Sequence, residues 1–360
     1  MAEQPTLNTV LNELIAQNLL SSESQPQIVK VLKDSPEKIP TPWFISTLIG
    51  ASAWLAVIPF IGFLFITKLI ESPASAIAVG IILIIGTIFL DYVKRDALFI
   101  NQLNLALNLT GQILFIFGIG VEKQDIAAAA LATWFLEIVL IGVYQNSILR
   151  FLAVLIATVA ALILLYDFNI HQGIHFLIVL IAAGAIWYWI AESRHLTDDM
   201  MMNLYQPLGY GFAIALQMVL ILSILPSSKF VSPLTWSFST LGLTVLLLML
   251  EYHILQTNHI PLLSHKSYAI FGGTLLMALL LYQGPGIIAA TIVLLLGFQR
   301  GNKVLMGLAV AFFTLFFVAY YYYLDITLLM KSITLMSAGV TLLVLRFVFK
   351  HVSPLSEGGQ

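Results

Sequence analysis

Long apolar runs separated by short polar joints make up the chain from residue 43 onward. A transmembrane α-helix needs about 20 consecutive, mostly apolar residues, so the pattern predicts about twelve membrane-spanning helices. Only Gly284-Pro285-Gly286 separates the ninth run from the tenth, so one broken helix or a re-entrant pair, with ten or eleven spans in all, is the alternative. The predicted spans are residues 43–66, 74–91, 98–120, 126–144, 148–166, 173–191, 207–225, 234–255, 267–283, 285–299, 303–324 and 327–348.

The first 42 residues follow a different pattern. Apolar residues recur at helical spacing over residues 7–19, a second short helix is expected over residues 25–34, and Pro40 and Pro42 end the segment. This pattern predicts a small cytoplasmic helical head over residues 1–42, which lies on the membrane surface or docks on a partner. A transmembrane bundle over 43–348 and a cytoplasmic tail over 349–360 complete the predicted domains.

Composition supports the same fold class. Hydrophobic residues make up 60% of the chain and charged residues 9%, whereas an average soluble domain has about 25% charged residues. The net charge of −2 gives no basis for nucleic-acid binding, and the absence of cysteine excludes disulfides, thiolate metal sites and cysteine nucleophiles. The predicted fold is therefore all-α, a polytopic transmembrane helical bundle in contact with the lipid bilayer.

The basic residues orient the predicted bundle. With the N-terminus in the cytoplasm, most of the sixteen Lys and Arg residues fall on the cytoplasmic side, as the positive-inside rule expects. An even number of spans then places both termini in the cytoplasm. The residues on that side are Lys30, Lys33, Lys38, Lys94, Arg95, Arg150, Arg194, Lys266, Arg300, Lys303, Arg346 and Lys350, and those on the other side are Lys68, Lys123, Lys229 and Lys331.

The third predicted span carries a stripe of amides. Asn101, Asn104, Asn108 and Gln112 follow the spacing i, i+3, i+7, i+11 and share one helix face. An amide in hydrocarbon must find a hydrogen-bond partner, so this face is expected to turn inward or toward water. Two interpretations remain open: hydrogen bonds that hold neighbouring helices together, or a path for a polar solute or ion.

Glu137 lies in the middle of the fourth predicted span, in the segment ATWFLEIVLIG. A charged group at the bilayer centre costs at least about 2.5–3.5 kcal/mol, so Glu137 is expected to be protonated or paired. The amide stripe of the preceding helix is the expected partner. Glu137 is then either part of a proton or cation relay or a neutral, hydrogen-bonded structural residue.

The segment AYYYYLDITLLMKS (319–332) is unusually polar. Successive helical residues step by about 100°, so Tyr320, Tyr321, Tyr322 and Tyr323 surround the helix, as in an interfacial aromatic belt. Asp325 is expected to cap the last helix and Lys331 to extend its amine back to the interface. Alternatively, Asp325, Lys331 and some of the tyrosines line an outward-facing vestibule or a partner surface.

Two histidine-containing clusters are weak metal-site candidates. Asp167, His171 and His175 follow i, i+4, i+8, but Asn169 and Gly173 indicate that a turn interrupts the helix. Wet interfacial histidines are therefore the favoured interpretation. The second cluster lacks fixed spacing and is assigned to the cytoplasmic side; it comprises Glu251, His253, His259 and His265.

The C-terminal run 300–346 resembles the bacterial integral-membrane family named domain of unknown function 4401. The shared features are Arg300-Gly301-Asn302, Gly307, the tyrosine cluster, Thr327-Leu328-Leu329, Lys331-Ser332, Gly339 and Arg346, with NLLSSE and PWF near the start of the chain. The resemblance implies a multispanning inner-membrane protein, often encoded beside a membrane-anchored protein with a GDYXXLXY motif. It implies no reaction, no cofactor and no catalytic residues.

Three functions are therefore considered. The first, which the resemblance favours, is a non-enzymatic partner or scaffold for a membrane-anchored envelope protein of the GDYXXLXY type. The second is a small-solute or ion transporter that uses the amide stripe and Glu137. The third is a membrane-embedded enzyme, for which the sequence offers no Walker A, GxSxG or HExxH motif.

Overall fold

A computed structural model describes residues 43–93, 98–144, 146–192, 199–222, 236–282 and 284–323, together with 329, 332, 333 and 336. Within these residues the fold is all-α, with eleven helices, as the hydropathy pattern predicts. The helices are α3 (Trp43–Ile66), α4 (Pro73–Val93), α5 (Leu98–Lys123), α6 (Ile126–Val143), α7 (Ser147–Asp167), α8 (Gly173–Glu192), α9 (Asp199–Ile221), α10 (Ser237–Thr257), α11 (His265–Leu280), α12 (Pro285–Gln299) and α13 (Lys303–Tyr323).

The chain divides into two compact units, Met1–Ser52 and Ala53–Gln360. Of the first unit, the structure describes only Trp43–Ser52, the beginning of α3. The predicted helical head over residues 1–42 and the predicted tail over 349–360 lie outside the described residues. All contacts discussed below belong to the second unit.

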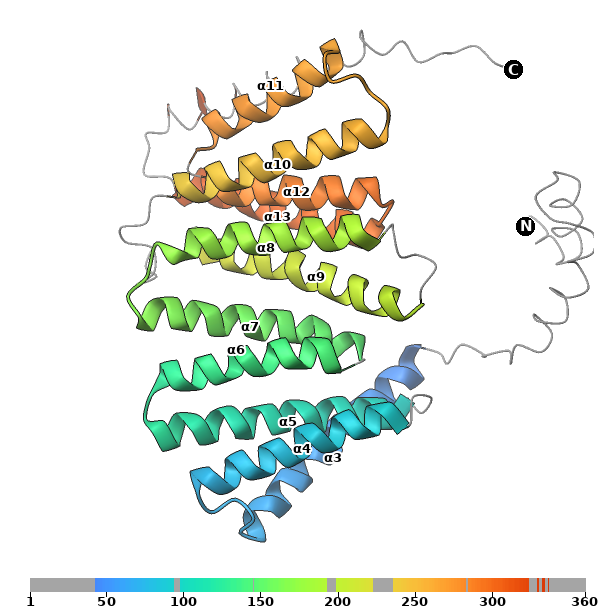
Figure 1. The fold of residues 1–360 in the computed structure, drawn as a ribbon, viewed down its shortest axis with the longest axis vertical. Helices are drawn as coiled ribbons and strands as arrows, with labels where there is room; N and C mark the ends of the chain where they lie inside the picture. The colour runs from blue at the N-terminus through green and yellow to red at the C-terminus, as the bar shows by residue number, and fades with distance from the viewer. Residues whose placement is uncertain are drawn as a thin grey trace, which may run out of the picture. The chain divides into compact units, whose positions relative to one another are not determined.

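Consecutive helices of the second unit pair as antiparallel hairpins. The pairs α4–α5, α6–α7, α8–α9 and α12–α13 each pack along their length, and the pairs lie side by side (Figure 1). Helix α7 packs on α9, α5 packs on α6, and α10 packs on α8, α11 and α12. The short connections explain this order, because neighbours in sequence tend to become neighbours in space.

Among the described residues, fewer candidate membrane spans are found than the sequence predicts. Six of the described helices are long and apolar enough to cross a membrane, namely α4, α5, α6, α7, α8 and α10, whereas twelve spans are not shown. In the other helices, the apolar stretch whose side chains are described has 10–17 residues. The ninth and tenth predicted spans are separate helices, α11 with 16 residues and α12 with 15, each below the usual length of about 17–25 residues. The twelfth predicted span lies almost entirely outside the described residues.

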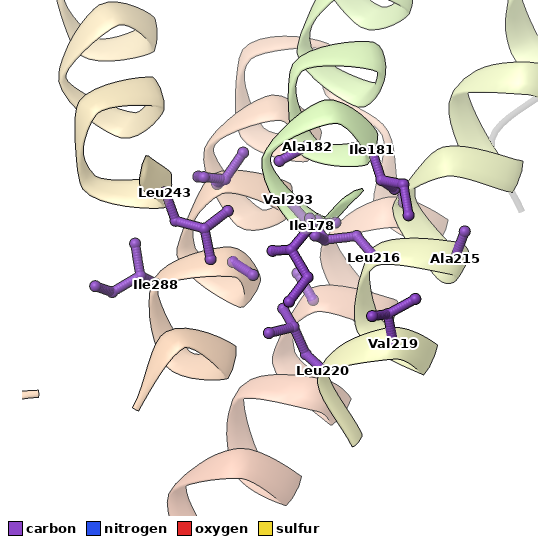
Figure 2. Close-up of a cluster of buried hydrophobic side chains, with 14 of the residues drawn as sticks. Ile178, Ile181, Ala182, Ala215, Leu216, Val219, Leu220, Leu243, Ile288 and Val293 are labelled. Carbon is purple, nitrogen blue, oxygen red and sulfur yellow. The ribbon is translucent and has the colours of Figure 1, made fainter. Parts of the chain in front are cut away.

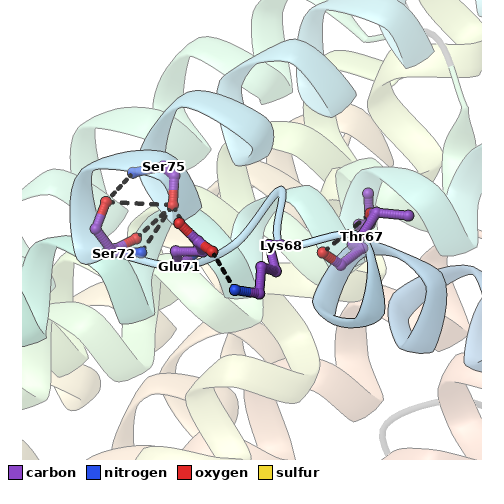
Figure 3. A network of polar contacts seen from close by, with 6 residues as sticks. Thr67, Lys68, Glu71, Ser72 and Ser75 are labelled. Carbon is purple, nitrogen blue, oxygen red and sulfur yellow. Dashed lines mark hydrogen bonds and ion pairs between the residues drawn. The ribbon is translucent and has the colours of Figure 1, made fainter.

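Local sequence explains several helix ends. The turn before α4 is shown in Figure 3, where Ser72 and Ser75 cap each other: the Ser75 amide donates to Ser72 Oγ at 3.2 Å, and the Ser72 amide donates to Ser75 Oγ at 3.0 Å. The Asp125 and Asn146 side chains cap α6 and α7, because each accepts at least one hydrogen bond from a backbone amide in the first turn of its helix. Between α7 and α8, Asn169 has a φ of 56°, which confirms the turn that the sequence indicates there.

Buried aliphatic side chains from α7, α8, α9, α10, α12 and α13 form the main core. Figure 2 shows Ile178 and Ile181 of α8 beside Leu216 of α9, with Leu243 of α10 and Ile288 of α12 in the same cluster. The outer surface is also apolar. Phe176, Trp187 and Phe298, for example, are 72%, 68% and 78% exposed. A surface of this kind, on helices long enough to span a membrane, is in contact with the lipid bilayer.

Glycines allow α4 and α5 to approach closely. A Cβ atom added at Gly80 would lie 2.7 Å from the carbonyl oxygen of Gly111, and one added at Gly118 would lie 2.7 Å from the carbonyl oxygen of Pro73. Small residues at helix contacts strengthen packing in membranes, where no hydrophobic force draws helices together. This close contact fixes the position of α5 and its amides against α4.

Candidate functional site

The amide stripe of α5 lies at the contact with α4 and the end of α6. Asn104, Asn108 and Gln112 are buried, with 4%, 0% and 2% of their surfaces exposed, and Asn101 is half-buried. The structure therefore turns the polar face of α5 into the bundle, where the cost of exposing amides to hydrocarbon is avoided.

Hydrogen bonds join these amides into one chain. Asn104 Nδ2 donates to the Thr87 carbonyl oxygen at 2.9 Å and to the Tyr144 hydroxyl at 2.8 Å. Asn108 Nδ2 donates to Thr87 Oγ1 at 2.7 Å, and Gln112 Nε2 donates to Asn108 Oδ1 at 2.8 Å. Thr87 is thus the link on α4, and Tyr144 is the link at the end of α6.

This chain of polar groups reaches far into the bundle. The step from Asn104 to Gln112 is eight residues, or about 12 Å along the helix axis. At its shallow end, the carboxylate of Asp91 acts electrostatically on both Tyr144 and Arg150. The polar groups therefore lead from a charged cluster at the helix ends toward the middle of the bundle.

Glu137 is completely buried in α6, with 0% of its surface exposed. Neither of its carboxyl oxygens has a hydrogen-bond partner in the part of the chain that the structure describes. The expected hydrogen bond to the α5 stripe is therefore wrong for the described residues. Gln112, the amide at this depth, donates instead to Asn108 within its own helix.

Two contacts place Glu137 level with Gln112. Asn104 of α5 is hydrogen-bonded to Tyr144 at the end of α6. Because the two helices are antiparallel, Gln112, eight residues after Asn104, lies at the depth of Glu137, seven residues before Tyr144. At the other end of these helices, Ala129 Cβ would lie 3.7 Å from a Cβ atom added at Gly120. Gln112 is eight residues before Gly120, and Glu137 is eight residues after Ala129. The unpartnered acid and the deep end of the amide chain are therefore at one depth on adjacent helices.

A second buried acid was missed by the sequence prediction. Glu251 lies within the predicted span 234–255 but was grouped with the histidines assigned to the cytoplasmic side; in the structure it is 8% exposed in the candidate span α10. Thr274 Oγ1 of α11 donates to Glu251 Oε1 at 2.5 Å, and Oε2 has no partner among the residues described. Glu251 precedes the last residue of α10, Thr257, by six positions, as Glu137 precedes Val143 in α6. Its apolar context, LLLMLEYHIL, is the signal that points to burial.

Gln217 is also buried and was not singled out from the sequence. It lies on α9 with 0% exposure, and neither atom of its amide group has a partner in the described ranges. Its neighbours Leu216, Val219 and Leu220 belong to the apolar core. A single glutamine in an apolar run gives no periodic signal, which explains why it was overlooked.

The histidine clusters do not form metal sites in the described residues, where no group of three His, Asp or Glu side chains comes together. Asp167 is exposed at the end of α7, and the His171 ring packs edge-on against Tyr166. His175 is buried on α8, with its Nδ1 2.6 Å from Ser239 Oγ of α10. In the second cluster, His253 is half-buried and His259 and His265 are exposed.

The predicted vestibule or partner surface falls largely outside the described residues. Helix α13 ends at Tyr323, and Tyr322 is 71% exposed. The side chains of Tyr320, Tyr321 and Tyr323, and both Asp325 and Lys331, are not described. The aromatic belt, the cap and the partner surface stay predictions.

The model of one protein family, domain of unknown function (DUF4401), matches residues 42–352 of the chain. The protein belongs to this family. The resemblance seen in the sequence is thereby confirmed over nearly the whole chain. No curated protein and no solved structure matches the chain.

In this DUF4401 chain, the shared motif Arg300-Gly301-Asn302 forms the turn between α12 and α13. Gly301 has a φ of +61°, a left-handed conformation that glycine adopts at little cost. Asn302 Oδ1 accepts hydrogen bonds from the amides of Val304 and Leu305 at 3.1 and 3.0 Å and so caps α13. The Arg300 guanidinium donates to the Ile190 carbonyl at the end of α8, at 3.0 Å. The motif therefore joins three helix ends.

Proposed function

We propose that this DUF4401 protein transports ions across the membrane, with the proton as the transported ion and Glu137 as the group that carries it. The observation that supports this proposal is a fully buried glutamate without a hydrogen-bond partner among the described residues, on a helix long enough to span the bilayer. An ionisable residue in such a position is costly for the fold and points to function.

The surroundings of Glu137 favour a proton as the transported species. The carboxylate form is opposed by the cost of a charge in hydrocarbon, at least about 2.5–3.5 kcal/mol. No basic residue is hydrogen-bonded to Glu137 in the described part of the chain. Binding a proton neutralises the group, and releasing it requires a polar path to water.

The hydrogen-bonded chain on α4, α5 and α6 supplies such a path on one side. It runs from Tyr144 through Asn104, Thr87 and Asn108 to Gln112, which is level with Glu137. The hydroxyl groups of Tyr144 and Thr87 both donate and accept, and the amides orient the water that reaches them. The predicted orientation, with both termini in the cytoplasm, makes this the cytoplasmic half of the path.

Potential-driven proton flux in proteoliposomes tests the proposal. An imposed membrane potential drives protons inward, and a pH-sensitive dye inside the vesicles reports their entry. Wild-type protein is expected to raise the flux about tenfold or more over protein-free vesicles, and Glu137→Gln to remove the increase because an amide cannot carry a proton. Glu122→Gln, an exposed glutamate at the end of α5, is the matched control.

Two results would contradict the proposal. One is wild-type flux no greater than that of empty vesicles. The other is a Glu137→Gln variant that conducts as well as wild type. The second result would fit the scaffold hypothesis, in which a GDYXXLXY-type membrane-anchored protein binds the chain and Glu137 has a purely structural role.

A further inference from the structure

A pocket of about 500 Å³ lies between α7, α9 and α13, on a different side of α7 from the polar chain. This volume is within the range of about 300–1,000 Å³ that is usual for small-ligand sites. None of the residues assigned to proton transfer lines it. The lining residues are Ser147, Ile148, Phe151, Gln206, Pro207, Tyr210, Ile214 and Val304.

The pocket extends from the helix ends toward the bundle centre. Ser147 is the first residue of α7, and Gln206 is an exposed residue of α9, directly before Pro207. Ile214 lies eight residues further along α9, about 12 Å deeper by helix rise, and Phe151 lies one turn deeper on α7. The wall is mostly apolar along its whole length, from Ile148 and Val304 at the helix ends to Phe151 and Ile214 deeper in the bundle.

We propose that this pocket binds an anionic phospholipid of the bilayer, with its phosphate near the helix ends and part of an acyl chain against the apolar wall. The apolar wall fits an acyl chain, and the hydroxyl of Ser147 at the start of α7 can donate to a headgroup phosphate. Ile148 and Val304 are 45% and 68% exposed, so the pocket opens on the lipid-facing surface. This proposal is independent of the proposed proton transport.

The charge beside the pocket selects an anionic headgroup. Lys303, the residue before Val304, is exposed and has no ion pair among the described residues, where the single ion pair joins Lys68 to Glu71. None of the described residues that line the pocket is acidic. The N-termini of α7 and α13 are both at this end, and their helix dipoles favour a negative charge there.

The turn Arg300-Gly301-Asn302 holds Tyr210, one of the polar groups of the pocket, in place. Asn302 Nδ2 donates to the Tyr210 hydroxyl at 2.5 Å, and the Tyr210 ring packs edge-on against Trp189 with centroids 5.1 Å apart. Asn302 also caps α13, which carries Val304. A site whose groups are fixed before the ligand arrives loses less conformational entropy on binding.

Native mass spectrometry of the full chain, released from nanodiscs that contain equal amounts of phosphatidylglycerol and phosphatidylcholine, tests this proposal. Wild type is expected to retain one phosphatidylglycerol in preference to phosphatidylcholine. Val304→Trp should fill the pocket mouth and abolish retention. Val310→Trp, a 54% exposed valine on the same helix outside the pocket, should retain the lipid.

Lys303→Gln separates charge from packing, because it leaves the pocket walls unchanged. It is expected to lower phosphatidylglycerol retention about fivefold, the effect of one basic residue at an anionic surface. Equal retention of both lipids by wild type would overturn the proposal, and so would undiminished retention in Val304→Trp. If Val304→Trp does not fold, unchanged retention in Lys303→Gln overturns it alone.

Discussion

Replacing Gly80 by alanine is expected to separate α4 from α5 and to weaken the polar chain between them. The added Cβ would lie 2.7 Å from the carbonyl oxygen of Gly111 and 2.8 Å from the backbone nitrogen of Phe115. Both are backbone atoms of α5, so no side-chain rotation relieves the contact and the helices must move apart.

The magnitude follows from two effects. Overpacking of a tight contact costs about 1–3 kcal/mol. Moving α4 away also stretches the hydrogen bonds from Asn104 and Asn108 to Thr87, and interhelical bonds in membranes are worth about 0.6 kcal/mol each. The free energy of unfolding should therefore fall by about 2–4 kcal/mol in total.

Gly86 provides a matched control on the same helix, because a Cβ built there has no neighbour within 4 Å. Gly86→Ala should be neutral or stabilising by about 0.5–1 kcal/mol, since alanine is a better helix former than glycine. The assay is reversible unfolding from mixed micelles, followed by helical circular dichroism. If Gly80→Ala proves as stable as Gly86→Ala, the close approach of α4 and α5 is wrong.

Two further substitutions test the second buried acid and the shared turn. Thr274→Val removes the hydroxyl that donates to Glu251. It should lower the free energy of unfolding by about 1–3 kcal/mol, because a buried acceptor loses its donor. Thr314→Val, at an exposed position, should change this free energy little, and equal effects of the two substitutions would argue against the Glu251–Thr274 contact. Gly301→Ala should cost about 1–2 kcal/mol in the same assay, because an L-residue is strained at the φ of +61°. Gly307→Ala, with no atom within 4 Å of the added Cβ, is its control, and a Gly301→Ala variant as stable as this control would contradict the left-handed turn.

Sequence periodicity was sufficient to predict the polar face of α5. Asn104, Asn108 and Gln112 recur at helical spacing, and an amide in hydrocarbon must turn toward a partner. Their partners could not be predicted, because Thr87 and Tyr144 are single polar residues on other helices and show no period. Among the described residues, Glu137 has no hydrogen-bond partner. This depends on how the neighbouring helices are rotated about their axes, which cannot be predicted from a single sequence.

Depth in the bundle was harder to predict than the existence of helices. Glu251 was grouped with histidines assigned to the cytoplasmic side, although it lies within the predicted span 234–255. The structure buries it in α10, where it accepts a hydrogen bond from Thr274 of α11. Hydropathy predicted the bounds of α12 at residues 285–299, but it placed the end of α11 at residue 283 instead of 280. Family membership was readable from the Arg300-Gly301-Asn302 region, and the structure gives its physical basis as a turn that joins three helix ends.

Whether the buried Glu137 carries an exchangeable proton can be measured directly. Infrared spectroscopy of the protein in lipid detects the carbonyl stretch of a protonated carboxylic acid, which shifts when the acid exchanges its proton for deuterium from D₂O. If Glu137 carries the proton, the spectrum should contain a carbonyl band that shifts in D₂O. This band should be lost in Glu137→Gln and should persist in Glu251→Gln. A Glu137→Gln spectrum identical to that of wild type would show that Glu137 holds no exchangeable proton and would contradict its role as a proton carrier.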